Sequence, residues 1–203
     1  MEIVDHPFSP GDLVAGHLAL DLVNTVTARN GNPRDWLSGY ATLREWAALT
    51  GSFAQGDLVR LAALAETEPA EAEAALRRLK DLREALHRIV SRRLQEGAPD
   101  PQDLRRLQGH WKAAAAAATL SPRPVWRAEI SGLDLVRHRS AWEAVDLLES
   151  QDPARVRVCD GPDCGWLFVD TSKNNRRRWC DMKDCGNVAK ARRHLAKLRT
   201  QGT

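Results

Sequence analysis

Two cysteine pairs constrain this chain of 203 residues more than any other feature. Cys159 and Cys164 are separated by four residues, Cys180 and Cys185 by another four, and 15 residues lie between the pairs. Each short turn brings two sulfur atoms to one side of an ion, and two such turns complete a tetrahedron. We predict that the four thiolates bind one structural Zn²⁺ ion, because four protein ligands leave no open position for catalysis.

Disulfides are the rival use of these cysteines, and the rest of the chain argues against them. The stretch from Met1 to Gly11 lacks the basic and apolar regions of a secretory signal. The sequence contains no run of about 18 apolar residues, so it predicts no membrane span. We therefore expect a cytoplasmic protein with no membrane partner, in a reducing compartment where structural disulfides are rare.

The segment around the cysteines predicts a small treble-clef-like module. Trp166–Val169 and Arg177–Trp179 are interpreted as the two arms of a hairpin between the cysteine pairs. So short a module cannot bury enough core by itself, so we expect zinc removal to unfold Cys159–Arg199 and to leave the preceding residues folded. A basic helix is predicted from Gly186 onwards, with an inward apolar face made of Val188, Ala191, Leu195 and Leu198.

The residues before the module predict a mainly helical domain. Apolar residues recur at intervals of three and four from Leu76 to Leu94, in a helix expected to begin near Pro69 and to end near Gly97. Leu18–Val26 fits either a helix or a strand. Further helices are predicted over 40–50, 57–66, 101–120 and 135–148, the last with Trp142 facing inward, and a strand over 125–130.

These patterns together predict an α+β chain of two domains. A mainly helical α/β domain is expected over residues 1–152, and the zinc module with its basic C-terminal helix over residues 153–203. The boundary is placed at Asp152 and Pro153, because a turn-forming pair there separates the last predicted helix from the first cysteine.

The basic charge of the chain is concentrated in the zinc module. The whole chain carries 30 Lys and Arg against 27 Asp and Glu, a net charge of +3. Residues 155–199 hold 12 basic and five acidic residues, a net of +7, and the remainder has a net of −4. Four thiolates and one Zn²⁺ reduce the net charge of the module to about +5. This charge favours duplex DNA as a partner, over the alternative that the basic surface contacts only solvent. The candidate nucleic-acid contacts are Lys173, Arg176, Arg177, Arg178, Lys190, Arg192, Arg193 and Lys197.

The same residues carry a family resemblance. Cys159–Arg199 resembles the CGNR zinc finger of bacterial proteins, in which the second cysteine pair is followed by Gly-Asn-Arg. Here Cys185 is followed by Gly and Asn, and Val188 takes the place of the arginine. The stretch Gly16–Thr25 resembles the start of the ABATE domain that precedes this finger. The resemblance implies an α/β sensor-like domain and a zinc finger, in a family of stress-induced transcription regulators.

Three polar residues near the start of the chain are candidates for a ligand pocket. His17, Asp21 and Asn24 fall at i, i+4 and i+7, on one face of a helix if a helix forms there. They are the predicted lining for a small-molecule effector, and capping or buried hydrogen bonding is the alternative. No Ser-His-Asp order, phosphate loop or carboxylate pair stands out, so we expect no enzymatic activity.

Two classes of function remain. The first is a DNA-binding transcription regulator that uses the zinc finger and its basic face, while the N-terminal domain senses a ligand or forms an oligomer. The alternative is a zinc-stabilised adaptor that binds RNA or another protein without sequence-specific DNA binding. Salt-dependent binding to duplex DNA distinguishes the two.

Overall fold

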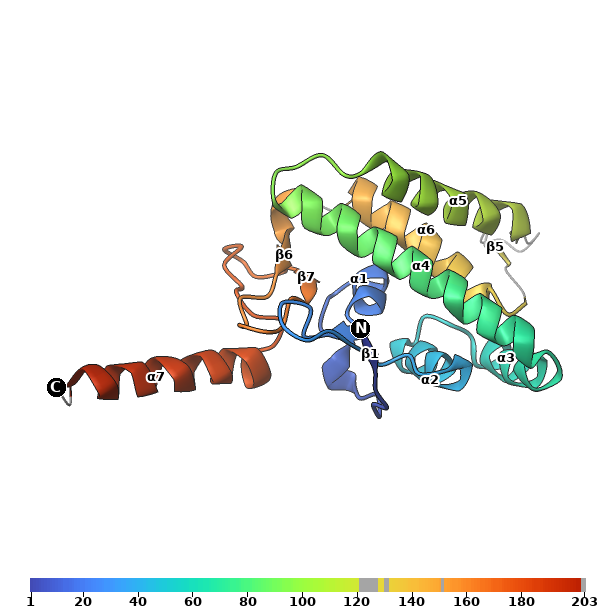
Figure 1. Ribbon diagram of the computed structural model, residues 1–203. Coiled ribbons are helices and arrows are strands. Elements are labelled where there is room, and N and C mark those ends of the chain that lie inside the picture. Colours follow the sequence, from blue (N-terminus) through green and yellow to red (C-terminus); the bar gives the residue numbers. More distant parts are fainter. Residues whose placement is uncertain (121–127, 130–131, 151, 202–203) are drawn as a thin grey trace.

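The computed structural model describes residues 1–120, 128–129, 132–150 and 152–201 (Figure 1). Its helical elements are η1 (Pro10–Asp12), α1 (Leu18–Val23), α2 (Tyr40–Thr50), α3 (Gln55–Thr67), α4 (Pro69–Leu94), α5 (Pro101–Ala117), α6 (Leu135–Ser150), η2 (Pro153–Arg155), η3 (Met182–Gly186) and α7 (Asn187–Gln201). Its strands are β1 (Glu2–Ile3), β2 (Val26–Thr27), β3 (Arg34–Asp35), β4 (Thr119–Leu120), β5 (Ala128–Glu129), β6 (Val156–Val158) and β7 (Leu167–Val169). The predicted class is confirmed: a mainly helical domain precedes a small module that contains the four cysteines.

The long helix α4 organises the body. It packs against α5 and α6, and α1 lies against α4, α6 and β7 (Figure 1). The predicted apolar stripe forms the buried face of α4, because residues at intervals of three and four share one side of a helix. Its buried members include Leu76, Leu79, Leu82, Leu86 and Ile89. No helix in the described ranges combines the length and hydropathy that a bilayer span requires.

Local signals set both ends of α4. Pro69 occupies the first turn, where its missing N–H costs nothing. At the other end, Glu96 rather than Gly97 takes the left-handed conformation, with φ of 57°. The N–H groups of Glu96 and Gly97 donate to the carbonyls of Arg93 and Arg92, at 3.0 and 2.9 Å. These two bonds form a Schellman-type cap that satisfies the last carbonyls of the helix.

The structure corrects the predictions for α5 and α6 and decides the segment that the sequence left open. The ambiguous segment 18–26 forms α1, followed by the short strand β2. The alanine-rich helix α5 ends at Ala117 rather than near Leu120, because Ala118 is extended and Thr119 enters a strand paired with β5. Of the strand predicted over 125–130, the structure describes only Ala128–Glu129, and the other residues lie outside the described ranges. Trp142 does not face inward on α6: 39% of its surface is exposed.

In the hairpin of the zinc module, β7 pairs with a different segment from the one that the sequence predicts. Strand β7 pairs antiparallel with β6, which precedes the first cysteine, and Arg177–Trp179 is not a strand. The buried carboxylate of Asp170 explains the difference. It accepts the N–H groups of Ser172 and Arg177 at 2.8 Å each, so the chain turns into a loop after β7. Residues 171–178 therefore form a loop that returns to Cys180.

The C-terminal helix α7 does not bury the apolar face that the sequence predicts. It begins directly after η3 and projects away from the body (Figure 1). Val188 and Leu195, predicted to face inward, are 47% and 56% exposed. The side chain of Leu198 lies outside the described part of the chain. The prediction that this helix has an inward apolar face is therefore wrong at Val188 and at Leu195.

One hydrophobic core extends across the predicted domain boundary. It joins α1 and α4 side chains such as Leu20 and Leu86 to Phe168 of β7, which is fully buried. Cys159 and Cys180 lie at the edge of the same cluster. The zinc module thus contributes its own hairpin to the core of the N-terminal domain.

Candidate metal centre and nucleic-acid interface

The four cysteines converge as the spacing predicts. Their Sγ atoms all lie within 4.8 Å of one another. The Sγ atom of Cys180 is 3.7 Å from those of Cys164 and Cys185. A tetrahedron with Zn–S bonds of about 2.3 Å has edges of about 3.8 Å, whereas a disulfide requires about 2.05 Å. The cluster fits one structural zinc ion.

Hydrogen bonds favour a negative charge on the first sulfur of the cluster. The thiols of Cys164 and Cys180 lower the pKa of Cys159, and the backbone N–H groups of Cys180 and Gly161 add to this effect. Those N–H groups lie 3.2 and 3.3 Å from the sulfur. The same bonds to Cys159 raise the pKa of Cys164 and Cys180, since each must give up a donated proton to ionise. A cation is therefore needed before all four sulfur atoms ionise, and zinc supplies it.

Close packing around the first cysteine turn requires glycine at two positions. A Cβ atom at Gly161 would lie 2.9 Å from Sγ of Cys185. Gly165 has φ of +70°, and a Cβ atom there would lie 2.8 Å from Oδ1 of Asn30. The N–H of Arg29 donates to the carbonyl of Cys164 at 3.0 Å. The cysteine turn is thus in direct backbone contact with a loop of the N-terminal domain.

Buried polar groups attach the hairpin to the same domain. Asn24 donates to the carbonyl of Leu167 at 2.8 Å and accepts its N–H at 2.9 Å, so one side chain satisfies both backbone groups of a strand residue. The indole N–H of Trp166 donates to the carbonyl of Val26 at 3.2 Å, and its ring packs edge-on against Trp36. Trp166 is therefore a core residue.

Arg177 has an internal role rather than the predicted nucleic-acid contact. Its guanidinium donates to the carbonyls of Trp179, at 3.0 Å, and of Val14, at 2.9 Å, and it also donates to the carbonyl of Cys180. The same group lies 4.3 Å from the centre of the Phe168 ring. The neighbours Arg176 and Arg178 are exposed. Arg177 links the zinc module to the N-terminal domain.

The remaining predicted contacts divide by their ion pairs. Arg178 pairs with Asp160 at 2.7 Å, and Arg192 lies 3.8 Å from Asp163. The side chain of Lys197 lies outside the described part of the chain. Four exposed cations form no ion pair with any side chain in the described ranges: Lys173 and Arg176 on the loop, and Lys190 and Arg193 on α7.

His17, Asp21 and Asn24 lie in α1 or at its two ends, and each forms a hydrogen bond with the backbone. His17 caps the helix by accepting the N–H of Ala19 at 3.3 Å, and Asp21 accepts the N–H of Ala15 at 3.0 Å. Asn24 binds Leu167, as described above. Burial raises the pKa of Asp21 to about 6, against the opposing hydrogen bond from Ala15. The three side chains are used in capping and buried hydrogen bonds, which agrees with the capping and hydrogen-bonding alternative.

His17 also approaches two carboxylates of α6 but is poorly arranged to bind a metal. Its Nε2 atom lies 3.5 Å from Asp146 and 3.9 Å from Glu143. Because Nδ1 accepts a backbone N–H, the neutral ring carries its proton on Nε2. That nitrogen then donates toward the carboxylates and has no free lone pair for a cation. The contact ties α1 to α6.

A buried ion cluster in the N-terminal domain has no counterpart among the predicted residues. Arg83 is fully buried and binds both carboxylate oxygens of Asp35, at 2.7 and 2.9 Å, while Lys80 lies 2.9 Å from the same carboxylate. Although burial opposes ionisation, the bonds from Arg83 lower the pKa of Asp35. The signal in the sequence is the position of Arg83, four residues after Leu79 and inside the apolar stripe of α4.

Comparison with known proteins identifies two family matches. A family model described as "Putative stress-induced transcription regulator", ABATE, matches residues 16–151. The model of the CGNR zinc finger matches residues 155–197. A search of curated proteins finds no match. The resemblance drawn from Gly16–Thr25 and Cys159–Arg199 is confirmed, and the first match covers more than half of the chain.

Proposed function

Because the chain belongs to the ABATE family and carries a CGNR zinc finger, we propose that it is a transcription regulator that binds duplex DNA through its zinc module. The observation that carries the proposal is the set of four exposed cations without acidic partners in the described ranges. Two lie on the loop that follows β7, and two on α7. Unpaired cations on one module are the groups that neutralise phosphates and release counterions.

The shape of α7 supports the same proposal. The helix has 15 residues and a length of about 22 Å. It projects from the body (Figure 1). The major groove of B-DNA is wide enough to admit an α-helix. Lys190 and Arg193 are three residues apart and therefore share one side of it. We expect these two to contact phosphates, while Val188, in place of the family arginine, contributes no charge in the first turn.

The test measures DNA binding against salt concentration for the full chain with zinc. The double variant Lys190→Ala/Arg193→Ala should bind all duplex sequences more weakly and lower the salt slope by about 0.9 for each lost phosphate contact. Its matched control is Arg105→Ala/Lys112→Ala, which removes two exposed cations from α5 and should leave the slope unchanged. Zinc content should be the same in all three proteins.

Two results would overturn this proposal. One is the absence of duplex binding by the parent chain at ~50 mM salt, where phosphate contacts are strong. The other is tighter, equally salt-dependent binding to single-stranded RNA of the same length, which would favour the adaptor function.

A further inference from the structure

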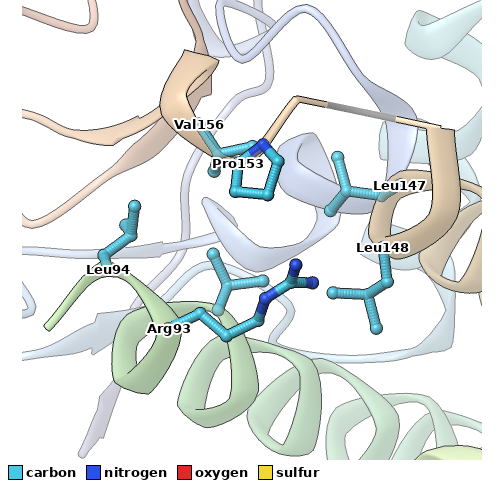
Figure 2. A pocket seen from close by; sticks show the side chains of 7 residues that line it. Arg93, Leu94, Leu147, Leu148, Pro153 and Val156 are labelled. Atoms are coloured by element: carbon cyan, nitrogen blue, oxygen red, sulfur yellow. The ribbon is translucent and has the colours of Figure 1, made fainter. Parts of the chain in front are cut away.

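A pocket lies at the joint between the N-terminal domain and the zinc module (Figure 2). Its walls come from the last two turns of α4, from the C-terminal end of α6, and from Pro153 and Val156. Pro153 lies between the two family matches, which end at residue 151 and begin at residue 155. The pocket therefore contacts both parts of the chain at the segment that connects them.

The floor of the pocket is apolar and buried. Val90, Leu147 and Val156 are 3%, 2% and 9% exposed and belong to the shared core. Leu94 and Leu148 form a partly exposed rim. The enclosed space of the pocket is ≈ 40 Å³ and opens to solvent on one side. Only a short apolar tail fits inside it, so the polar end of an occupant must lie at the open mouth.

Arg93 is the polar group of the pocket among its described lining residues. Its guanidinium extends from α4 toward Leu148 (Figure 2). It forms no ion pair or hydrogen bond with any side chain in the described ranges, unlike Arg88, one and a half turns earlier, which binds Asp103 at 2.7 Å. No acidic residue of the described ranges lines the pocket. The site thus combines an apolar floor with one available planar cation.

We propose that this pocket binds a small organic carboxylate with a short apolar tail. The tail covers the floor made by Val90, Leu147 and Val156, and the carboxylate pairs with the guanidinium of Arg93. Arginine matches both oxygens of a carboxylate, which makes this pairing specific as well as strong. A neutral hydrocarbon would desolvate the guanidinium without replacing its hydrogen bonds, and an amine would be repelled by it.

The site differs from the predicted ligand pocket and does not depend on DNA binding. His17, Asp21 and Asn24 lie elsewhere, on α1. Val156 begins β6, the strand that runs directly into Cys159 and pairs with β7. A bound carboxylate would therefore tie α4 and α6 to the strand that leads to the first zinc ligand. This position suits an effector that reinforces the joint between the two domains.

The test uses the zinc-loaded full chain and sodium hexanoate as the probe. Hexanoate should raise the melting temperature in a saturable way, because a ligand of the native state stabilises it by mass action. Hexylamine and hexan-1-ol have the same tail length and serve as controls for tail burial. We expect no shift with the amine and a smaller shift with the alcohol.

Substitutions locate the site. Arg93→Gln should weaken hexanoate binding by about tenfold or more, as expected for the loss of a charged hydrogen-bonding partner. Arg92→Gln is the matched control, since Arg92 is exposed in the same turn but does not line the pocket. Both arginines also offset the negative end of the α4 dipole, so each variant is compared with its own melting temperature without ligand. Leu148→Glu, which places a competing carboxylate beside Arg93, should also abolish the shift.

Three results would overturn the proposal: no saturable shift with hexanoate, an equal shift with hexylamine, or an undiminished shift in Arg93→Gln. A loss of equal size in Arg92→Gln would also contradict it, because the carboxylate would then not be held by Arg93. None of these measurements involves DNA, so failure here and failure of the proposed function are distinguishable.

Discussion

In the first half of the zinc module, from Val156 to Cys180, most large apolar side chains are buried against the N-terminal domain, although Val158 is 43% exposed. On α7 the contrast is clear: Leu195 is 56% exposed, while Phe168 of β7 is fully buried. Strand β7 and helix α7 each follow a cysteine turn and both halves carry basic residues, so charge and metal do not explain the contrast. The hairpin lies within a core that it shares with α1 and α4. Among the described elements, α7 packs closely only on η3. The module is therefore not self-contained.

This contrast matters because the two halves have different sources of stability. A single helix of about 15 residues without tertiary packing is marginal in water, so α7 depends on its attachment to the cysteine turn and on any partner that it binds. The hairpin gains its stability from burial in the body. An exposed helix held at one end suits an element that presents side chains to a partner, and a buried hairpin suits an element that holds the module in place.

Zinc removal should produce the largest effect and should reach the N-terminal domain. If the cysteine cluster opens, β7 loses its anchor, and the shared core loses several large side chains, a loss comparable with the whole stability of a domain. We expect the helical circular dichroism of the full chain to melt at a clearly lower temperature after chelation, and zinc addition to restore it. This revises the sequence-based expectation that the body stays folded. Separate melting of an unchanged helical body would show that the two parts are independent.

Truncation of one apolar side chain in each half tests the contrast directly. Phe168→Ala should lower the free energy of unfolding by about 3–5 kcal/mol, because it leaves a cavity in the shared core. Leu195→Ala on α7 should change it by less than about 0.5 kcal/mol, as expected for an exposed position. Denaturant unfolding of the zinc-loaded proteins measures both. Similar losses in the two variants would mean that α7 is packed in solution.

Removal of the Asn24 side chain should loosen the attachment of the hairpin. Asn24→Ala leaves the N–H and carbonyl of Leu167 buried without partners, which costs about 1–3 kcal/mol for such a group. Asn32→Ala, at an exposed position in the nearby loop, is the control and should be neutral. The expected loss appears in unfolding of the whole chain rather than of the zinc module alone. A neutral Asn24→Ala would contradict the role assigned to these two hydrogen bonds.

A smaller, pH-dependent effect is expected from Asp21, which supports the loop that meets the hairpin. Asp21 accepts the N–H of Ala15, and the carbonyl of Ala15 accepts the N–H of Val169 at 2.8 Å. Burial raises the pKa of Asp21 to about 6, so the folded state binds more protons than the unfolded state between about pH 4 and 6. Stability contributed by this group therefore falls as pH rises through that window.

The substitution Asp21→Asn should remove this penalty and keep the hydrogen-bond acceptor for Ala15. We expect a gain of about 1–3 kcal/mol in the free energy of unfolding at pH 7 and almost none at pH 4. Asp5→Asn, at an exposed acid, should show no such dependence. Denaturant titrations at the two pH values make the comparison, and a gain that is equal at both would exclude titration of Asp21 as its cause.

Local patterns in the sequence identify most of the helices and the metal centre. The stripe from Leu76 to Leu94, the proline at the start of α4 and the cysteine spacing all act over a few residues, where the geometry of a helix or a turn determines which side chains meet. The same reasoning fails at Val188 and Leu195. Periodicity places them on one face of a helix, but only the neighbouring elements determine whether that face is covered.

What the sequence by itself determined is the set of four zinc ligands, the helical class of the N-terminal domain and the family to which the chain belongs. Only the tertiary structure decided that β6 rather than Arg177–Trp179 pairs with β7, that Asn24 binds Leu167 across 143 residues, and that α7 stands free. The physical reason is the range of the interactions. Turn and helix geometry depends on residues close in the chain, whereas burial and the satisfaction of buried polar groups depend on segments that meet only after folding.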